Sequence, residues 1–406
     1  MLTSKDALKA LAREAAMMPQ EQLMEVPHLN KKLFIGLPRE TSFQENRVAL
    51  VPEAVALLVS NGNDVVLESN AGKNANFQDR DYSEAGARIV NDKSEVFKAE
   101  IILKVAPPSE EEINMLQEKQ TLFSALQLSV QPKDTLKKLM QKKVTAIAWD
   151  FIKDEEGIYP VVRAMGEIAG NTSMLIAAEY LSNINNGQGM MLGGIAGVAP
   201  SRVIILGAGT VGEFAARAAL GLGASVKIFD NSIYRLRRLQ NDLGIRLYTC
   251  VLQPDQLKEA LSTADVVIGA LRGKDGRSPC VVTDEMVSQM KFGSVIVDVS
   301  IDQGGCFETS KVTNHADPIF KKHGVIHYCV PNIPSRVSRT ASYALSNIFT
   351  PILLDIADGG GTPNFIKADK GFRNGIYIYN GLLTNDILGQ AFDLPYTHLD
   401  LLLAVL

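Results

Sequence analysis

The chain has 406 residues, of which 46% are hydrophobic, and this length allows two domains with a full core each. The formal net charge of −4 predicts no binding of nucleic acid or of an acidic membrane surface. No apolar run approaches the roughly 20 residues of a membrane-spanning helix. The four cysteines include no C-x-x-C pair, the five histidines match no metal spacing, and we expect no signal peptide. These features favour a cytoplasmic protein with reduced thiols and no bound metal.

Residues 1–31 are expected to form an N-terminal extension, because the regular pattern of strands and helices begins only after them. The extension carries apolar residues at helical spacing. They are Ala7, Leu8, Leu11, Ala15 and Ala16. A first doubly wound domain is then predicted over residues 32–160, where Pro52 begins a helix that stops at Asn61 and Gly62. Its expected strands are 32–36, 64–68, 100–105, 121–126 and 144–149.

A long helix over 161–181 should lead into a second α/β unit. Its expected strands are 202–206, 225–229, 264–269, 294–298 and 325–329. An apolar helix over 341–358 and the tail find no strand partners in that unit, so we expect residues 339–406 to return to the first domain. The predicted fold class is therefore α/β, with two doubly wound Rossmann-like domains, a second domain over 161–338 and a cleft between the two.

The most informative motif is Gly207-Ala-Gly209-Thr-Val-Gly212, which follows a buried strand and precedes a helix. Gly207 allows the tight turn, Gly209 lets the backbone approach a pyrophosphate, and Gly212 lets the helix pack on the sheet. Asp230 closes the next strand, where a carboxylate accepts hydrogen bonds from both hydroxyls of an adenine ribose. A 2′-phosphate would meet a like charge there, so the motif predicts NAD rather than NADP.

Two further residues are candidates for chemistry. Arg47 follows the first strand, at the sheet edge where α/β proteins bind ligands, and its guanidinium would hold a carboxylate in a fork. The alternative is a surface arginine that solvates a loop. Asp302 follows the strand 294–298 and would face the same cleft from the other side. The alternative for Asp302 is a turn aspartate that accepts from its own backbone ahead of two glycines.

With these residues the chain resembles the alanine dehydrogenase and transhydrogenase NAD(H)-subunit family, from about Leu33 to about Ala391. The resemblance is closer to alanine dehydrogenase. It is carried by Glu45-Asn-Arg47-Val-Ala-Leu, Ile101-Ile-Leu-Lys-Val105, Gly207 to Gly212, Ile301-Asp-Gln-Gly-Gly-Cys-Phe-Glu308 with His315-Ala-Asp-Pro318, and Tyr328-Cys-Val-Pro-Asn332-Ile-Pro-Ser-Arg336.

The resemblance implies NAD as cofactor and a small amino acid or 2-oxo acid as substrate. It implies that residues 32–160 and 339–406 form the substrate domain and residues 161–338 the NAD domain. Arg47 would bind substrate, Asp302 would close on the nicotinamide side, and Asn332 would contact the cofactor. We also expect a homo-oligomer, a dimer or a hexamer.

Two positions depart from the family pattern. Ala106 stands where the family has a substrate lysine, and Gln127 stands where it has the general acid/base histidine. Glutamine has no titratable proton near neutral pH, so Gln127 could orient a substrate but not shuttle a proton. Lys104 could reach part of the vacated space, because residues two positions apart on a strand point to the same face. The alternative is a lysine that solvates a strand end. Asp150 is a second candidate acid, or a turn residue.

Three functions remain open from the sequence. The first is an NAD(H)-dependent oxidoreductase that acts on a small 2-amino or 2-oxo acid. The second is a soluble NAD(H)-binding transhydrogenase subunit, which needs neither the lysine nor the histidine. The third is a non-catalytic NAD(H)-binding protein that kept the fold and lost turnover.

Overall fold

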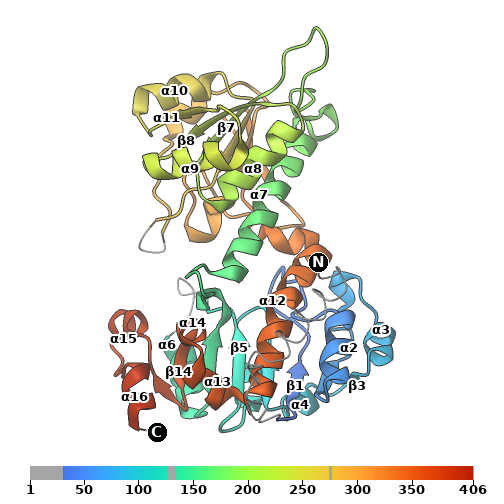
Figure 1. Ribbon diagram of the computed structural model, residues 1–406. Coiled ribbons are helices and arrows are strands. Elements are labelled where there is room, and N and C mark those ends of the chain that lie inside the picture. Colours follow the sequence, from blue (N-terminus) through green and yellow to red (C-terminus); the bar gives the residue numbers. More distant parts are fainter. Residues whose placement is uncertain (1–30, 127–132, 274–276, 406) are drawn as a thin grey trace, which may run out of the picture.

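A computed structural model describes residues 31–126, 133–273 and 277–405. Two α/β units are joined by the helix α7 (Pro160–Leu181), which runs between them (Figure 1). The chain returns from the second unit at the start of the helix α12 (Ser338–Asp358), which lies along the first unit. Gly170 of α7 lies against α8 (Thr210–Gly221), where an added Cβ would be 2.5 Å from the Val211 carbonyl oxygen. The close packing of these two helices therefore fixes α7 to the second unit.

The first unit contains an eight-stranded sheet in the order β15-β14-β6-β5-β4-β1-β2-β3. Neighbours from β3 to β6 pair in parallel, and β14 and β15 add an antiparallel edge. The strands are β1 (Phe34–Leu37), β2 (Asp64–Glu68), β3 (Arg88–Val90), β4 (Ile101–Leu103), β5 (Thr121–Ser124), β6 (Thr145–Ala148), β14 (Ile376–Tyr379) and β15 (Leu382–Leu383).

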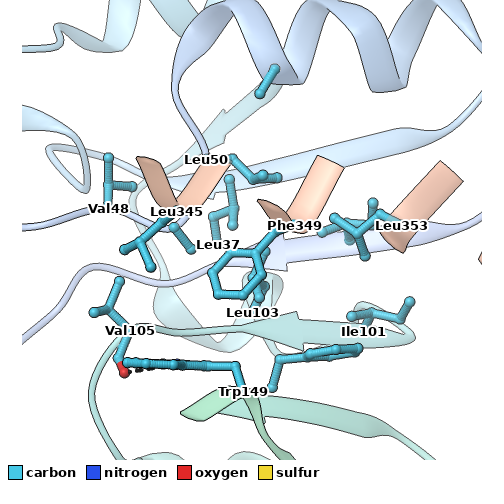
Figure 2. Close-up of a cluster of buried hydrophobic side chains, with 14 of the residues drawn as sticks. Leu37, Val48, Leu50, Ile101, Leu103, Val105, Trp149, Leu345, Phe349 and Leu353 are labelled. Carbon is cyan, nitrogen blue, oxygen red and sulfur yellow. Dashed lines mark hydrogen bonds between the residues drawn. The ribbon is translucent and has the colours of Figure 1, made fainter. Parts of the chain in front are cut away.

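Helices cover this sheet, and α12 supplies part of its core. Leu345, Phe349 and Leu353 of α12 pack over the apolar strands, and the Trp149 indole donates to the Val105 carbonyl at 3.2 Å (Figure 2). The other helices of the unit are α2 (Pro52–Ser60), α3 (Asp79–Glu84), α4 (Lys93–Val96), α5 (Glu110–Met115), α6 (Lys133–Gln141), α13 (Thr362–Ala368), α14 (Lys370–Arg373), α15 (Asp386–Phe392) and α16 (Leu399–Val405), with 3₁₀ turns η1 (Lys73–Ala75) and η2 (Trp149–Phe151).

The second unit contains a seven-stranded sheet in the order β12-β13-β11-β10-β7-β8-β9, parallel except for β12. The strands are β7 (Arg202–Leu206), β8 (Ser225–Phe229), β9 (Tyr248–Cys250), β10 (Val266–Gly269), β11 (Val295–Asp298), β12 (Ile319–Lys322) and β13 (Val325–Tyr328). The helices are α8, α9 (Ile233–Leu243), α10 (Pro254–Ser262) and α11 (Asp284–Ser288), with 3₁₀ turns η3 (Asn183–Asn185), η4 (Val299–Gln303) and η5 (Ile333–Val337).

The predicted fold class is confirmed: both sheets are doubly wound, and in each the strand order reverses next to the first strand of the unit. The ligand-binding edges are therefore the carboxyl ends of β1 and β4 in one sheet and of β7 and β10 in the other.

Several strand ends differ from the sequence prediction. The strand predicted over 100–105 ends at Leu103, so Lys104 and Ala106 both lie after the strand and do not share a strand face. Five short strands were not predicted: β3, β9, β12, β14 and β15. These strands carry little periodic signal because their pattern is only two to four residues long, and all but β14 are edge strands.

The four-part division of the chain and the cleft stay predictions. The described cavities lie elsewhere, within the first unit. Among the described residues, no helix is both long and apolar enough to cross a membrane.

Candidate functional site

The glycine loop after β7 has the geometry of a dinucleotide site. Gly207 has φ +115°, and an added Cβ would lie 2.3 Å from the Ala270 carbonyl oxygen, at the end of β10. An added Cβ on Gly212 would lie 1.9 Å from the Gly207 carbonyl oxygen, so the turn and the helix require both glycines. At Gly209, by contrast, nothing lies within 4 Å of an added Cβ. Open space beside the N-terminus of α8 is what a pyrophosphate would fill.

Asp230 follows β8 and reaches back to this loop. Its carboxylate oxygens accept from the Ala208 N–H at 2.8 Å and from the Ser232 N–H at 2.7 Å. The side chain is buried, and Arg235 approaches it at 3.9 Å. Each carboxylate oxygen has more than one acceptor site, so both could also accept from ribose hydroxyls. The residues fit NAD at this end of the site.

Arg47 is buried, which excludes the surface-loop reading of this residue. Its guanidinium forms a fork with Glu45, with Nε–Oε1 at 2.7 Å and Nη2–Oε2 at 2.5 Å, and Nη1 lies 3.3 Å from the Met165 sulfur. The contacts described for Arg47 use three of the five N–H donors of its guanidinium. Two donors therefore remain for a substrate carboxylate.

Serines of η5 and α12 hold the loop that carries Arg47. Ser335 accepts from the Asn46 N–H at 2.8 Å and donates to the Gln44 carbonyl at 2.6 Å. Ser342 and Ser346, one turn apart on α12, accept from the N–H groups of Val48 and Val51. The sequence interpretation missed these serines. Their helical spacing within an apolar helix was the available signal.

Asn332 connects Arg47 to Asp302. Its backbone N–H donates to Asp302 Oδ1 at 3.0 Å, and its side-chain Nδ2 donates to Glu45 Oε2 at 3.0 Å. Asn332 has φ +56°, a left-handed conformation that asparagine tolerates better than most residues. The contact of Asp302 with the distant Asn332 differs from that of a turn aspartate bonded to its own backbone. Asp298, at the end of β11, has that role instead, since it accepts from the Ser300 N–H.

The charges of this cluster stabilise each other. Burial alone would lower the pKa of Arg47, but the carboxylates of Glu45, Glu40 and Asp302 raise it. Burial alone would raise the pKa of Glu45, but Arg47 outweighs it and holds that pKa below the ordinary value. Surrounding protein atoms partly desolvate the carboxyl of Asp302 and raise its pKa, although the residue is solvent-exposed. The hydrogen bond from the Asn332 N–H and the charge of Arg47 act in the opposite direction and lower that pKa.

Lys104 does not solvate a strand end, because its side chain is 1% exposed. Its Nζ lies 3.0 Å from Glu40 Oε2 and 3.2 Å from Glu112 Oε1. Burial would lower the pKa of Lys104, but these two carboxylates outweigh it and keep the amine protonated. Ala106 is also buried, at 3% exposure. Lys104 is therefore committed to an ion-pair cluster, which weakens the hypothesis that it replaces the missing lysine.

Gln127 lies outside the described residues. Asp150 lies in the 3₁₀ turn η2 and not in a strand, and its Oδ1 accepts from the N–H of Leu126, the residue before Gln127, at 3.1 Å. The structure thus brings together Arg47, Asp302 and Asn332, and places Gly207, Gly209, Gly212 and Asp230 together in the glycine loop. Lys104 stands apart from both groups in its hydrogen bonds.

Two doubly wound units, a glycine loop that fits a dinucleotide and a buried arginine facing a carboxylate cluster define a class: the two-domain dinucleotide-binding oxidoreductases. Comparison with known proteins specifies the family. Residues 36–169 match the model "Alanine dehydrogenase/PNT, N-terminal domain", and residues 173–386 match "Alanine dehydrogenase/PNT, C-terminal domain". The chain belongs to the alanine dehydrogenase/PNT family, and its second unit is the NAD-binding domain of that family.

Individual relatives agree with this assignment. Alanine dehydrogenase of Mycolicibacterium smegmatis is 39% identical over 366 residues, which cover 90% of this chain and 98% of that protein. Alanine dehydrogenase of Halomonas elongata is 42% identical over 363 residues, or 89% and 97% of the two chains. A solved L-alanine dehydrogenase superposes with a TM-score of 0.83 at 37% identity and covers 88% of this chain and 99% of its own. A transhydrogenase from Sinorhizobium meliloti, at 23% identity and TM-score 0.75, shares the fold.

Proposed function

We propose that this protein is an NAD(H)-dependent oxidoreductase for a small 2-amino or 2-oxo acid, with weak or no activity on L-alanine. The observation that carries the proposal is the hydrogen-bonded series Arg47–Glu45–Asn332–Asp302, which joins the loop after β1 to the NAD-binding unit. A carboxylate-binding cation and a carboxyl from the cofactor side thereby belong to one site.

The residues have separate roles in this proposal. The loop from Gly207 to Gly212 and Asp230 would hold NAD, which would supply the hydride acceptor. Arg47 binds the substrate carboxylate with the donors that Glu45 leaves, and Glu45 fixes the plane of the guanidinium. Asp302 covers the nicotinamide side and Asn332 holds Asp302 in place, in addition to the expected contact of Asn332 with the cofactor.

Two features support the expectation of weak or no activity on L-alanine. Ala106 has no group that could polarise a substrate carbonyl, and Gln127 has no titratable proton near neutral pH. Asp150 and Lys104 are the candidates for replacing them, but Lys104 already contacts two carboxylates. Binding of cofactor and acid can persist without these groups, whereas proton transfer then depends on another group, such as Asp150.

The test is to measure NADH formation with L-alanine and then with a panel of amino acids, alongside NADH binding by fluorescence. We expect tight NADH binding, weak or undetectable alanine oxidation and turnover of another small amino acid. NADH binding without turnover of any acid would instead support the non-catalytic alternative, which the replacements at Ala106 and Gln127 favour. Hydride transfer between NADH and a second nicotinamide nucleotide would support the transhydrogenase alternative.

A further inference from the structure

A buried ion pair bridges the switch point of the first sheet. Lys104 directly follows β4 and Glu40 lies shortly after β1, so the two side chains meet where the carboxyl ends of these neighbouring parallel strands form the ligand-binding edge. The Lys104 ammonium lies 3.0 Å from Glu40 Oε2, and the side chains are 1% and 6% exposed. Glu40 Oε1 also accepts from the Val105 N–H at 2.6 Å. The pair thus ties the segment after β4 to the segment after β1, which continues to Arg47.

Negative charge accumulates around Arg47, the proposed binder of the substrate carboxylate. Glu45 contacts its guanidinium, and the carboxylates of Glu40 and Asp302 are close enough to raise its pKa. Glu45 in turn raises the pKa of Glu40, because two neighbouring carboxylates repel each other. A substrate carboxylate would bring a further negative charge to this guanidinium. Its binding is therefore favoured when part of the negative charge already present is offset.

Within the part of the chain that the structure describes, Lys104 is the cation that forms an ion pair with Glu40. The second partner of Lys104, Glu112, also lies 3.5 Å from Lys93 and so keeps a cation without Lys104. Burial raises the pKa of Glu40, and the charge of Lys104 opposes that rise. Loss of Lys104 would therefore leave an uncompensated carboxylate near Arg47.

We propose that Lys104 is a positioning residue for substrate binding: it offsets the charge of Glu40 and thereby allows the carboxylate of a small 2-amino or 2-oxo acid to bind to Arg47. Lys104 contacts two glutamates and not the substrate, so this role differs from replacing the lysine that Ala106 lacks. The inference rests on the proposed function, because it presupposes that Arg47 binds the acid. A unit charge about 10 Å away changes the affinity for an anion by roughly tenfold at an effective dielectric constant of about 20.

Fluorescence titration of the full-length protein–NADH complex with pyruvate tests the proposal through two variants with opposite expected effects. Lys104→Met removes the cation and should weaken pyruvate binding about tenfold near pH 8.5. Glu40→Gln removes the carboxylate but keeps an acceptor for the Val105 N–H, and it should tighten pyruvate binding about threefold or more. The double variant restores the balance of charge and should bind within about twofold of the unaltered protein. A pair that served only the fold would weaken binding in both single variants.

The pH dependence of pyruvate binding separates charge from structure. In Lys104→Met the pKa of Glu40 should rise further, because the cation that opposes the rise is gone. The affinity of this variant should therefore approach that of the unaltered protein near pH 5.5, where Glu40 is protonated, and fall below it as the pH rises through the raised pKa. The other charged groups around the pair are present in both proteins and cancel in this comparison. They are Glu45, Arg47, Lys93, Glu112 and Asp302.

Lys143→Met is the matched control, because Lys143 pairs with Glu118 at 2.9 Å in the same unit but both side chains are more than half exposed. The control should leave the affinity for pyruvate unchanged. The proposal is overturned if Lys104→Met binds pyruvate like the control, or if Glu40→Gln fails to tighten binding, which decides the question even where Lys104→Met does not fold. Failure of the proposed function has a different signature: the unaltered protein binds no pyruvate, or Arg47→Lys leaves its affinity unchanged, and the role of Arg47 is then lost together with this inference.

Discussion

Asn332 donates its side-chain amide to Glu45 at 3.0 Å, so that a residue after β13 of the NAD-binding unit holds a residue after β1 of the first unit. The same asparagine donates its backbone N–H to Asp302. Since Glu45 fixes the guanidinium of Arg47, a single left-handed residue connects the position of Asp302 to the orientation of Arg47.

We predict that Asn332→Asp destabilises the protein more than Asn332→Gly does. Both residues tolerate the left-handed backbone, but the aspartate places a carboxylate against Glu45 instead of a donor. The loss should be about 1.5–3 kcal/mol near pH 8. It should shrink near pH 5, because repulsion raises the pKa of one carboxyl of the pair until that carboxyl is protonated. Urea unfolding of both variants at the two pH values measures this, and equal stabilities at both would contradict the contact.

Arg47→Lys should weaken binding of pyruvate to the protein–NADH complex by about tenfold or more. The lysine keeps the charge but loses the planar fork that Glu45 orients. Arg39→Lys is the matched control, since Arg39 is half exposed and lies 3.8 Å from Glu68. Fluorescence titration of the complex gives the affinities. If the Arg47 variant binds pyruvate as tightly as the Arg39 variant, Arg47 does not hold the substrate carboxylate.

NADH should bind far more tightly than NADPH, and Asp230→Ser should weaken NADH much more than NADPH. The substitution removes a charged acceptor of ribose hydroxyls, which is worth about 1.5–3 kcal/mol, or roughly 10–100-fold in affinity. Asp242→Ser, an exposed aspartate of α9 that pairs with Arg238, is the control and should change neither affinity. Equal affinities of the unaltered protein for the two cofactors would refute the role of Asp230.

The sequence predicted the features of this protein that depend on long patterns. The dinucleotide fold was predicted from the apolar runs of β7 and β8 and from the spacing of Gly207, Gly209 and Gly212. Each of these features has a steric role in that fold, so each can be recognised in the sequence. The surroundings of Lys104 were not predictable, because Glu40 and Glu112 come from two other segments. Asn332 was expected to contact the cofactor, but its contact with Glu45 depends on how the two units pack. Local periodicity does not encode such contacts between distant segments.

Asp298 should give the protein a measurable pH dependence of stability. Burial raises its pKa to about 6, against hydrogen bonds from Ser310, Cys306 and Ser300. A carboxyl whose pKa is raised by folding stabilises the folded state fully below pH 3.8, and the contribution is lost as the pH rises through about 6. The free energy of unfolding, relative to Asp298→Asn, should therefore fall by up to about 3 kcal/mol between pH 4 and pH 7. Parallel pH profiles for the two proteins would show that Asp298 ionises as in the unfolded chain.

The last prediction concerns Ala106 and Gln127. Ala106→Lys combined with Gln127→His should raise L-alanine turnover by about 10²-fold or more, because a positioned acid/base commonly contributes about 10²–10⁴ to a rate. The increases in turnover of the two single variants, multiplied together, should be smaller than the increase of the double variant, because carbonyl polarisation and proton transfer act in the same reaction. Ala106 is buried, so the lysine must find room beside Val105, and a melting curve should accompany each assay.

Gln141→His, on the exposed side of α6, controls for a histidine placed outside the site and should not raise turnover. Brisk oxidation of L-alanine by the unaltered chain would refute the argument. In that case another group transfers the proton, and Asp150 would be the first residue to replace, because its carboxylate accepts from the N–H of Leu126, directly before Gln127. Asp150→Asn, which keeps an acceptor for that N–H, should then abolish the turnover while NADH still binds.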